Sequence, residues 1–481
     1  GLWGVLIIDM IQFFIKMTAV FAAAWFSLVE VGERLVGKGA GGWAGLKALV
    51  EKLSTQQVVI PKVQKMVDGV AQVKDGVPVM VEGQPVMSVI NGTGQPFLDM
   101  LPNFTMSELA LMIFILPIAI GWWANWYPGA EPGGGSYIAQ RMLASKSEKD
   151  SLGGTLFFNI AHYVLRPWPW IITALCSIIV YPDLASIKSA FPAADVALIG
   201  HDSAFPAMLK FLPVGFVGLM VGGLIAANSS TILTHLNWGS SYLVHDFYRR
   251  FINKDATEGH YINVGRLSTV VLYVFAAVLS LFMTSAQQAF EVLLSIGAGT
   301  GLIYIARWFW WRVSAWCEIV AMLMSLVTSL AVPLLMPDTG FATRTIVQVT
   351  ITTLAWLITA YVGPETDRAT LISFYRKVKP VGPGWTDIRA EAGVTDAEVA
   401  QENRIGSALL GWISGCVVIW SSLFAIGNFL YSSGDPTRLK MAWILTAVFA
   451  VSGYVLLKVT QQLWADSTAS QAREDERLKQ G

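Results

Sequence analysis

Charged residues are scarce in this sequence. Only 14% of its 481 residues are Asp, Glu, Lys or Arg, whereas soluble domains carry about a quarter. The 33 basic residues balance the 33 acidic ones, so no net positive field favours nucleic acid as a partner. Cysteine is also scarce: Cys176, Cys317 and Cys416 lie far apart in apolar runs and form no metal or redox spacing. These shortages exclude an ordinary soluble domain and a nucleic-acid-binding protein.

Long apolar runs are what the sequence has in place of charge, and 54% of the residues are hydrophobic. A membrane-spanning helix needs about 20 mostly apolar residues. We predict about ten spans, at 2–28, 106–126 with a broken continuation at 134–144, 154–181, 207–233, 263–284, 288–311, 313–335, 345–363, 406–431 and 438–460. The chain is therefore predicted to be an all-α polytopic membrane protein in contact with a lipid bilayer.

Lys and Arg gather in alternate loops. These loops lie at 141–149, 249–266, 307–312 and 368–379. The opposite loops at 182–206 and 336–344 carry one basic residue each. Because basic loops stay on the cytoplasmic side of a membrane, we expect both chain ends to lie in the cytoplasm. We expect the membrane to be a bacterial inner membrane. The chain opens with Gly1 inside an apolar helix, so we expect it to begin within a longer protein.

An insertion at 29–106 interrupts the apolar pattern and is predicted to lie outside the membrane. Amphipathic patterns near 43–53 and 61–70 predict two helices, and alternating Val and polar residues around Asp75-Gly76 predict a hairpin. We expect membrane partner subunits to contact the chain through this insertion.

The segment 222–251 carries the first candidate site. Ala227, Ser230 and Thr231 stand at i, i+3 and i+4 and share one helix face. Two hydroxyls beside a backbone carbonyl form a hard oxygen site, which suits Na⁺ better than a soft metal. The alternative is that the hydroxyls bond back to their own helix and only tighten its packing.

This segment also resembles a known family. Gly-Leu-Ile-Ala-Ala-Asn-Ser-Ser-Thr at 223–231, followed by Leu236-Asn237 and Asp246-Phe247-Tyr248, is similar to the signature helix of the sodium:solute symporter family. Five more stretches resemble the family in its order, at 1–12, 137–146, 212–215, 264–266 and 309–310. The resemblance implies an inverted-repeat core of five plus five helices. It also implies that this sequence holds the last helix of the first repeat and the whole second repeat, without the first core helices.

The apolar runs and the resemblance together divide the chain into seven parts. They are a core helix at 1–28, the insertion at 29–106, the second-repeat core at 107–311, two peripheral spans at 312–363, a charged cytoplasmic linker at 364–405, a transmembrane hairpin at 406–461 and a cytoplasmic tail at 462–481.

For the ion, the resemblance implies that sodium is held by the Ala227 carbonyl and the Ser230 and Thr231 hydroxyls. Asp9 lies in an otherwise apolar run, and an intramembrane carboxylate is a functional candidate by default. Its match to the acidic residue of the family's fifth helix implies a place on the inner sodium path. The alternative is a hydrated carboxylate near the cytoplasmic end of the helix.

For the solute, the segment 122–135 is the main candidate. Two prolines and four glycines fall in the eight positions 128–135, so no continuous helix can form there. Broken backbone at membrane depth is tolerated where it lines a cavity. Asn125 and Tyr127 align near the solute site of the family's sugar transporters, whereas the Pro/Gly insert with Glu131 departs from them. The alternative is a purely structural hinge.

Three further polar residues complete the predicted solute site. His162 and Arg166 are four residues apart on the next span, and Glu291 opens a later one. A guanidinium fork suits a carboxylate, so we expect Arg166 to pair with Glu131 or Glu291 or to meet an anionic solute.

These observations predict a sodium-coupled secondary transporter that imports a small polar organic solute by alternating access. No nucleophile, general base or phosphate loop indicates an enzyme. The alternative is a transporter-derived membrane subunit or sensor without transport, which the insertion and the apparent loss of the first core helices favour.

Overall fold

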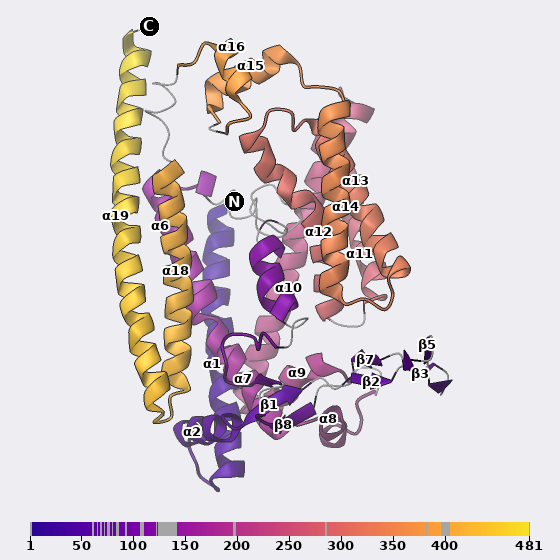
Figure 1. The fold of residues 1–481 in the computed structure, drawn as a ribbon, viewed down its shortest axis with the longest axis vertical. Helices are drawn as coiled ribbons and strands as arrows, with labels where there is room; N and C mark the ends of the chain where they lie inside the picture. The colour runs from indigo at the N-terminus through magenta and orange to yellow at the C-terminus, as the bar shows by residue number, and fades with distance from the viewer. Residues whose placement is uncertain are drawn as a thin grey trace. The chain divides into compact units, whose positions relative to one another are not determined.

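The computed structural model of the chain consists mainly of long helices (Figure 1). It describes residues 2–59, 62–64, 66–67, 70–71, 73–74, 77–78, 80–82, 86–91, 94–105, 110–121, 123, 142–195, 199–283, 286–380, 382–395 and 405–480. Among these residues, eight helices are long and apolar enough to cross a membrane: Met10–Leu35, Lys149–Val180, Val214–Ile252, Glu258–Ser280, Ala315–Leu335, Phe341–Val362, Ile405–Leu430 and Pro436–Ala465.

The prediction of an all-α polytopic membrane protein is confirmed. Two shorter apolar helices, Leu111–Gly121 and Leu293–Phe309, coincide with the predicted spans at 106–126 and 288–311. The predicted span at 207–233 differs most from the structure. Short helical turns precede Pro213, and the helix then continues well beyond residue 233, through α10 (Val214–Ser241) and the π-helical η7 (Tyr242–Ile252).

The chain divides into two compact units, Gly1–Leu49 with Arg166–Phe290, and Val50–Leu165 with Glu291–Gly481. In the first unit, α1 (Leu2–Leu35) packs against α7 (Pro167–Val180) and α10. Ala19 and Ala23 of α1 are buried against Met220 of α10. Small side chains let two membrane helices approach closely, so this contact brings the backbones of α1 and α10 together.

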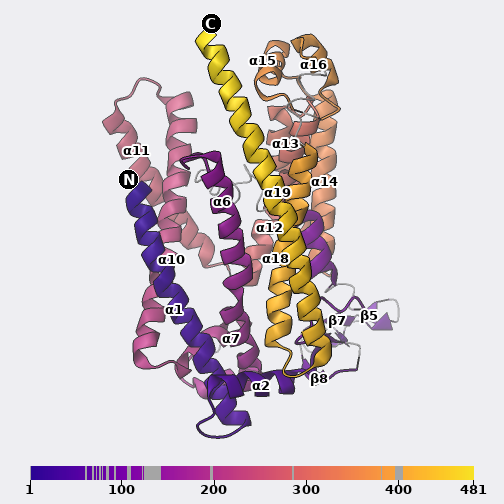
Figure 2. The ribbon, with the colours of Figure 1, turned by 90° about the vertical axis from the view of Figure 1, so that its left-hand side faces the viewer.

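The second unit contains two helix pairs. The helices α13 (Ala315–Leu335) and α14 (Phe341–Val362) pack along each other. The helices α18 (Ile405–Leu430) and α19 (Pro436–Gln480) form a long hairpin and lie side by side (Figure 2). Ser325 of α13 is buried and donates a hydrogen bond to the Ile296 carbonyl of α12 (Ala286–Phe309) at 2.5 Å. A buried hydroxyl of this kind holds adjacent membrane helices in one register.

The insertion is a small α/β segment. After α2 (Gly42–Leu53), strand β1 (Gln56–Val59) pairs with β8 (Val86–Val89) and β9 (Gln95–Pro96), antiparallel in both cases. The helix expected near 43–53 is confirmed. So is the hairpin, because β5 (Val73–Lys74) pairs with β6 (Val77–Pro78), while its turn at 75–76 lies outside the described residues.

The helix predicted near 61–70 is wrong. The described residues there form β2 (Lys62–Gln64), paired with β7 (Met80–Glu82), and β3 (Met66–Val67), paired with β4 (Val70–Ala71). The valines in this stretch suit a strand better than a helix, and pairing with the following segment overrides the weak helical pattern.

Contacts at the two ends of the second unit show which segments lie together at each end. At one end, Arg438 of α19 donates to the Leu98 carbonyl at 3.2 Å and lies 3.6 Å from the Asp99 carboxylate. The tip of the α18–α19 hairpin therefore lies on the same side as the insertion. At the opposite end, α15 (Arg368–Val378) and α16 (Thr386–Ala392) pack around Trp385, whose indole donates to the Arg307 carbonyl at 3.3 Å (Figure 1).

Candidate ion site and the α1–α10 cavity

Helix α10 positions the predicted sodium ligands. The Thr231 hydroxyl donates a hydrogen bond to the Ala227 carbonyl at 3.0 Å. A hard cation such as Ca²⁺ contacts its oxygen ligands at about 2.4 Å, so one cation of similar size can touch two oxygens that are 3.0 Å apart. Thr231 is exposed in this structure. The backbone of Ser230 continues α10 at this level, and its side chain lies outside the described part.

The register between α1 and α10 places Asp9 near these ligands. The two helices run antiparallel: the ring centroids of Phe26 and Phe216 lie 5.8 Å apart, and Lys16 lies against Gly223. One helical turn further, Gln12 and Ala226 line the same cavity. One more turn along both helices brings the Asp9 backbone to the level of residue 230. The Asp9 side chain itself lies outside the described part.

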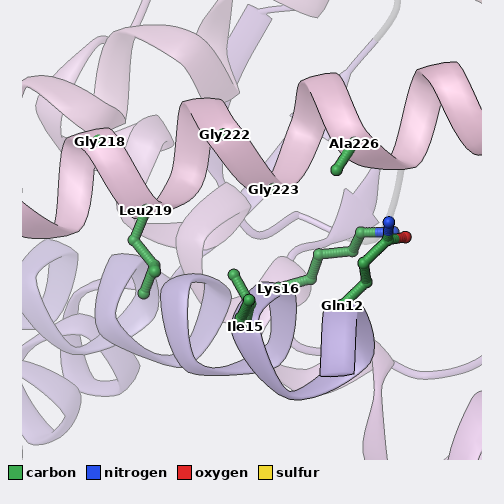
Figure 3. A pocket seen from close by; sticks show the side chains of 8 residues that line it. All are labelled: Gln12, Ile15, Lys16, Gly218, Leu219, Gly222, Gly223 and Ala226. Carbon is green, nitrogen blue, oxygen red and sulfur yellow. The ribbon is translucent and has the colours of Figure 1, made fainter. Parts of the chain in front are cut away.

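A cavity of about 240 Å³ lies between α1 and α10 and reaches along α10 as far as Ala226, the residue before Ala227. Its walls are Gln12, Ile15 and Lys16 of α1 and Gly218, Leu219, Gly222, Gly223 and Ala226 of α10. Figure 3 shows the Lys16 side chain running along the seam toward Gln12 and Ala226, away from Leu219. A Cβ atom at Gly223 would lie 3.3 Å from Lys16 Cγ. Glycine at this position therefore leaves room for the lysine chain.

Apolar atoms form the surface of the cavity, and its two polar residues, Gln12 and Lys16, both come from α1. Lys16 is half-buried, and Gln12 Oε1 is buried without a hydrogen-bond partner. Within the described part of the chain, no carboxylate lies within 4.0 Å of the Lys16 ammonium group. Neither Gln12 nor Lys16 was expected at a site from the sequence. The available signal was the spacing of Asp9, Gln12 and Lys16 at i, i+3 and i+7 in an apolar run, which places all three on one helix face.

The predicted solute residues are only partly visible. Asn125, Tyr127 and Glu131 lie outside the described residues, as does the side chain of Glu291 on α12. Trp123 is the last described residue before this segment, and its carbonyl packs against Gly301 of α12. A Cβ atom at position 301 would overlap this carbonyl, so the close approach requires a glycine there.

His162 and Arg166 occupy different surroundings. His162 lies in the π-helical η3 (Ile160–Leu165) and stacks on Phe158 with ring centroids 5.0 Å apart. Arg166 is exposed and caps α7 at the point where the two compact units divide. The two residues thus belong to different elements, because the π-helical η3 ends at Leu165 and Arg166 precedes Pro167 at the start of α7.

Comparison with known proteins identifies relatives of the chain. The family model described as "Sodium:solute symporter family" matches residues 1–324. The chain is 26% identical over 226 residues to a sodium/glucose cotransporter of Vibrio parahaemolyticus, covering 45% of this chain and 41% of that protein. It is 28% identical over 115 residues to an osmoregulated proline transporter of Bacillus subtilis, covering 24% and 23%. It is 27% identical over 209 residues to the human sodium/myo-inositol cotransporter 2, covering 40% and 30%. The chain thus spans less than half the length of each of these relatives.

Proposed function

Because this chain belongs to the sodium:solute symporter family, we propose that it works in a secondary transporter that couples sodium entry to the import of a small polar organic solute. The membrane helices, the oxygen pair on α10 and the antiparallel register of α1 support this proposal together. The solute is not assigned further, because relatives named for glucose, proline and myo-inositol match the chain at similar identities.

In this proposal, sodium binds the Ala227 carbonyl and the hydroxyls of Ser230 and Thr231, with Asp9 on the inner path. The observation that carries the assignment is the 3.0 Å separation of the Thr231 hydroxyl and the Ala227 carbonyl oxygen. The hydroxyl hydrogen can rotate away from the carbonyl when a cation arrives, since hydroxyl rotors adapt to their partners. Further oxygen ligands are needed to complete the shell of a hard cation.

The solute is proposed to bind at the broken segment that contains Asn125, Tyr127 and Glu131, with His162, Arg166 and Glu291 as additional contacts. Aromatic faces combined with an amide, a carboxylate and a guanidinium suit a solute that carries both apolar and polar groups. The packing of the Trp123 carbonyl against Gly301 holds one end of this segment on α12.

Transport is proposed to proceed by alternating access. Sodium on α10 stabilises the outward-open state, solute binding closes the segment at 124–135, and the inner path past Asp9 then opens. One sodium ion that crosses 100 mV releases about 2.3 kcal/mol, and a tenfold gradient adds about 1.4 kcal/mol. Together these terms support a solute accumulation of roughly several hundredfold.

The proposed orientation places the insertion outside and both chain ends in the cytoplasm of a bacterial cell. It is supported by the contact of Arg438 with the loop at Leu98–Asp99, which puts the α18–α19 tip on the side of the insertion. The basic residues around α15 lie at the opposite end of the same unit. Both facts agree with a cytoplasmic α15 and α16.

A non-transporting membrane subunit or sensor is the alternative. The folded insertion, with its β8–β1–β9 sheet, favours it because such a surface can carry a contact with a partner subunit. The two functions differ in whether the protein binds sodium.

Thermal unfolding of the purified full-length protein separates these alternatives. We expect the Tm to rise in sodium chloride relative to potassium or choline chloride at equal ionic strength, because a ligand that binds only the folded state stabilises it. The rise should disappear when Ser230 and Thr231 are both changed to Ala. A rise that persists in this variant contradicts the ion site, and no rise with any cation favours the subunit or sensor.

A further inference from the structure

Lys16 lies inside the membrane-spanning part of α1. The charged end of this helix, at Glu30, Glu33 and Arg34, marks one membrane boundary. About 20 residues cross the hydrocarbon core, which places Lys16 well within it. Intramembrane ionisable residues are rare and usually functional. The half-buried Lys16 therefore needs a role that offsets the cost of a charge at this position.

The Lys16 ammonium group and the candidate sodium site share one seam. Lys16 lies against Gly223, and its side chain extends toward Gln12 and Ala226 (Figure 3). Ala227, the first proposed sodium ligand, is the next residue along α10. The levels of Gly223 and Thr231 differ by about 12 Å along the helix axis, and those of Gly223 and Ala227 by about 6 Å. Because the Lys16 side chain points toward the site, its charge lies closer to these ligands along the axis than Gly223 does.

The buried oxygen of Gln12 indicates which kind of group suits the seam between α1 and α10. Gln12 Oε1 is buried without a partner, and an unsatisfied buried acceptor is costly unless a donor or a cation reaches it. The cavity of about 240 Å³ lies along the same seam, and both Gln12 and Lys16 border it, so the Lys16 side chain has space to change its course there. The other walls are apolar side chains and glycines, which offer no competing partner.

We propose that Lys16 is a tethered cation that opposes sodium binding at the Ala227–Thr231 site and so sets its affinity. The inference rests on the proposed function, because it needs sodium at that site. With the site empty, the Lys16 side chain lies along the α1–α10 seam and extends toward the site. When sodium binds, the two positive charges repel each other, so binding requires the ammonium group to withdraw along the seam.

The size of this effect follows from the distance. Two unit charges about 10 Å apart, at the effective dielectric constant of about 20 that describes protein sites, change an affinity by roughly tenfold. Removal of the Lys16 charge should therefore lower the sodium concentration needed for half-maximal stabilisation by about that factor. A variant that keeps the charge should not.

The test is a sodium titration of the Tm of the full-length protein, with choline chloride holding the ionic strength constant. The charge-removing variants are Lys16→Met and Lys16→Gln, so that one poorly folded variant does not end the test. Lys16→Arg keeps the charge. Lys210→Met is the matched control, because Lys210 belongs to the same unit but lies over the Phe191 ring, 5.5 Å from its centroid, away from the seam.

We expect the half-maximal sodium concentration to fall about tenfold in Lys16→Met and Lys16→Gln and to stay unchanged in Lys16→Arg and Lys210→Met. Sodium stabilisation that appears only after the Lys16 charge is removed supports the proposal more strongly. Unchanged midpoints in all variants overturn the role of Lys16 while the sodium site stands. If neither the parent protein nor any variant responds to sodium, the proposed function fails, and the competition fails with it.

Discussion

The hydroxyl of Thr231 and the carbonyl of Ala227 lie 3.0 Å apart on α10, joined by a hydrogen bond. A back-bond of this kind is common for threonine in a helix, so it serves packing in the absence of an ion. The same geometry presents two oxygens to one cation. The cavity that reaches Ala226 and the register of α1 place this pair close to the seam between the two helices.

Substitution of Thr231 tests whether its oxygen binds sodium. Thr231→Val keeps the shape and removes the hydroxyl, so we expect the sodium affinity to fall at least tenfold, or about 1.4 kcal/mol. Thr231→Ser keeps the oxygen and should retain most of the affinity. The measurement is the sodium-dependent Tm of the purified protein. Thr269→Val on α11 (Glu258–Ser280) is the control, because Thr269 makes the same back-bond to Gly265 at 2.9 Å and the change should leave the sodium response intact.

Gly301 is expected to tolerate no side chain. A Cβ atom there would overlap the Trp123 carbonyl, so Gly301→Ala should destabilise the protein by about 1–3 kcal/mol. In Gly415→Ala on α18 the new Cβ meets no atom within 4 Å, and the change should be neutral or stabilising by up to about 1 kcal/mol. Thermal unfolding compares the two variants. Equal Tm values would contradict the close approach of Trp123 to α12.

The pair of α15 and α16 depends on the buried indole of Trp385. Trp385 packs on Tyr375 and Ile388, both fully buried, so Trp385→Ala should cost about 3–5 kcal/mol of local stability. Limited proteolysis should then cut within 368–395. Trp316→Ala is the control, because that indole on α13 is 52% exposed. If both variants resist the protease equally, Trp385 does not hold this segment together.

The Arg368–Glu391 ion pair gives this segment a pH dependence. Arg368 donates two hydrogen bonds to the Glu391 carboxylate, at 2.8 and 2.5 Å, and these lower the pKa of Glu391 below its ordinary value. A lowered folded-state pKa stabilises the fold above the unfolded pKa of about 4.3, and the stabilisation is lost as the pH falls through the folded value.

Glu391→Gln should therefore lower the stability of the α15–α16 pair slightly at pH 7, because the ion pair is exposed. The difference from the parent protein should shrink as the pH falls below about 4. Protease sensitivity of 368–395, measured at both pH values with an acid-stable protease at low pH, checks this. A difference that grows toward low pH would contradict the assigned direction of the pKa shift.

Much of the architecture was predictable because it depends on local properties. Apolar runs identified ten helices of the structure at nearly the right places, since the membrane requires a fixed length of apolar residues. The hairpin at β5–β6 followed from its alternating pattern. The helix predicted near 61–70 failed because strand pairing with a later segment decided the conformation there.

The candidate ion site was also predictable only in part. Residue order alone was enough to place Ala227, Ser230 and Thr231 on one face of a helix, because three residues within two turns share a face whatever surrounds them. It could not show that Lys16 and Gln12 meet Gly223 and Ala226 across a cavity. That contact joins helices far apart in the chain, and it depends on how each helix is rotated and how the two are aligned. Those two quantities are decided by close packing of small residues such as Ala19 and Ala23, and therefore only by the folded structure.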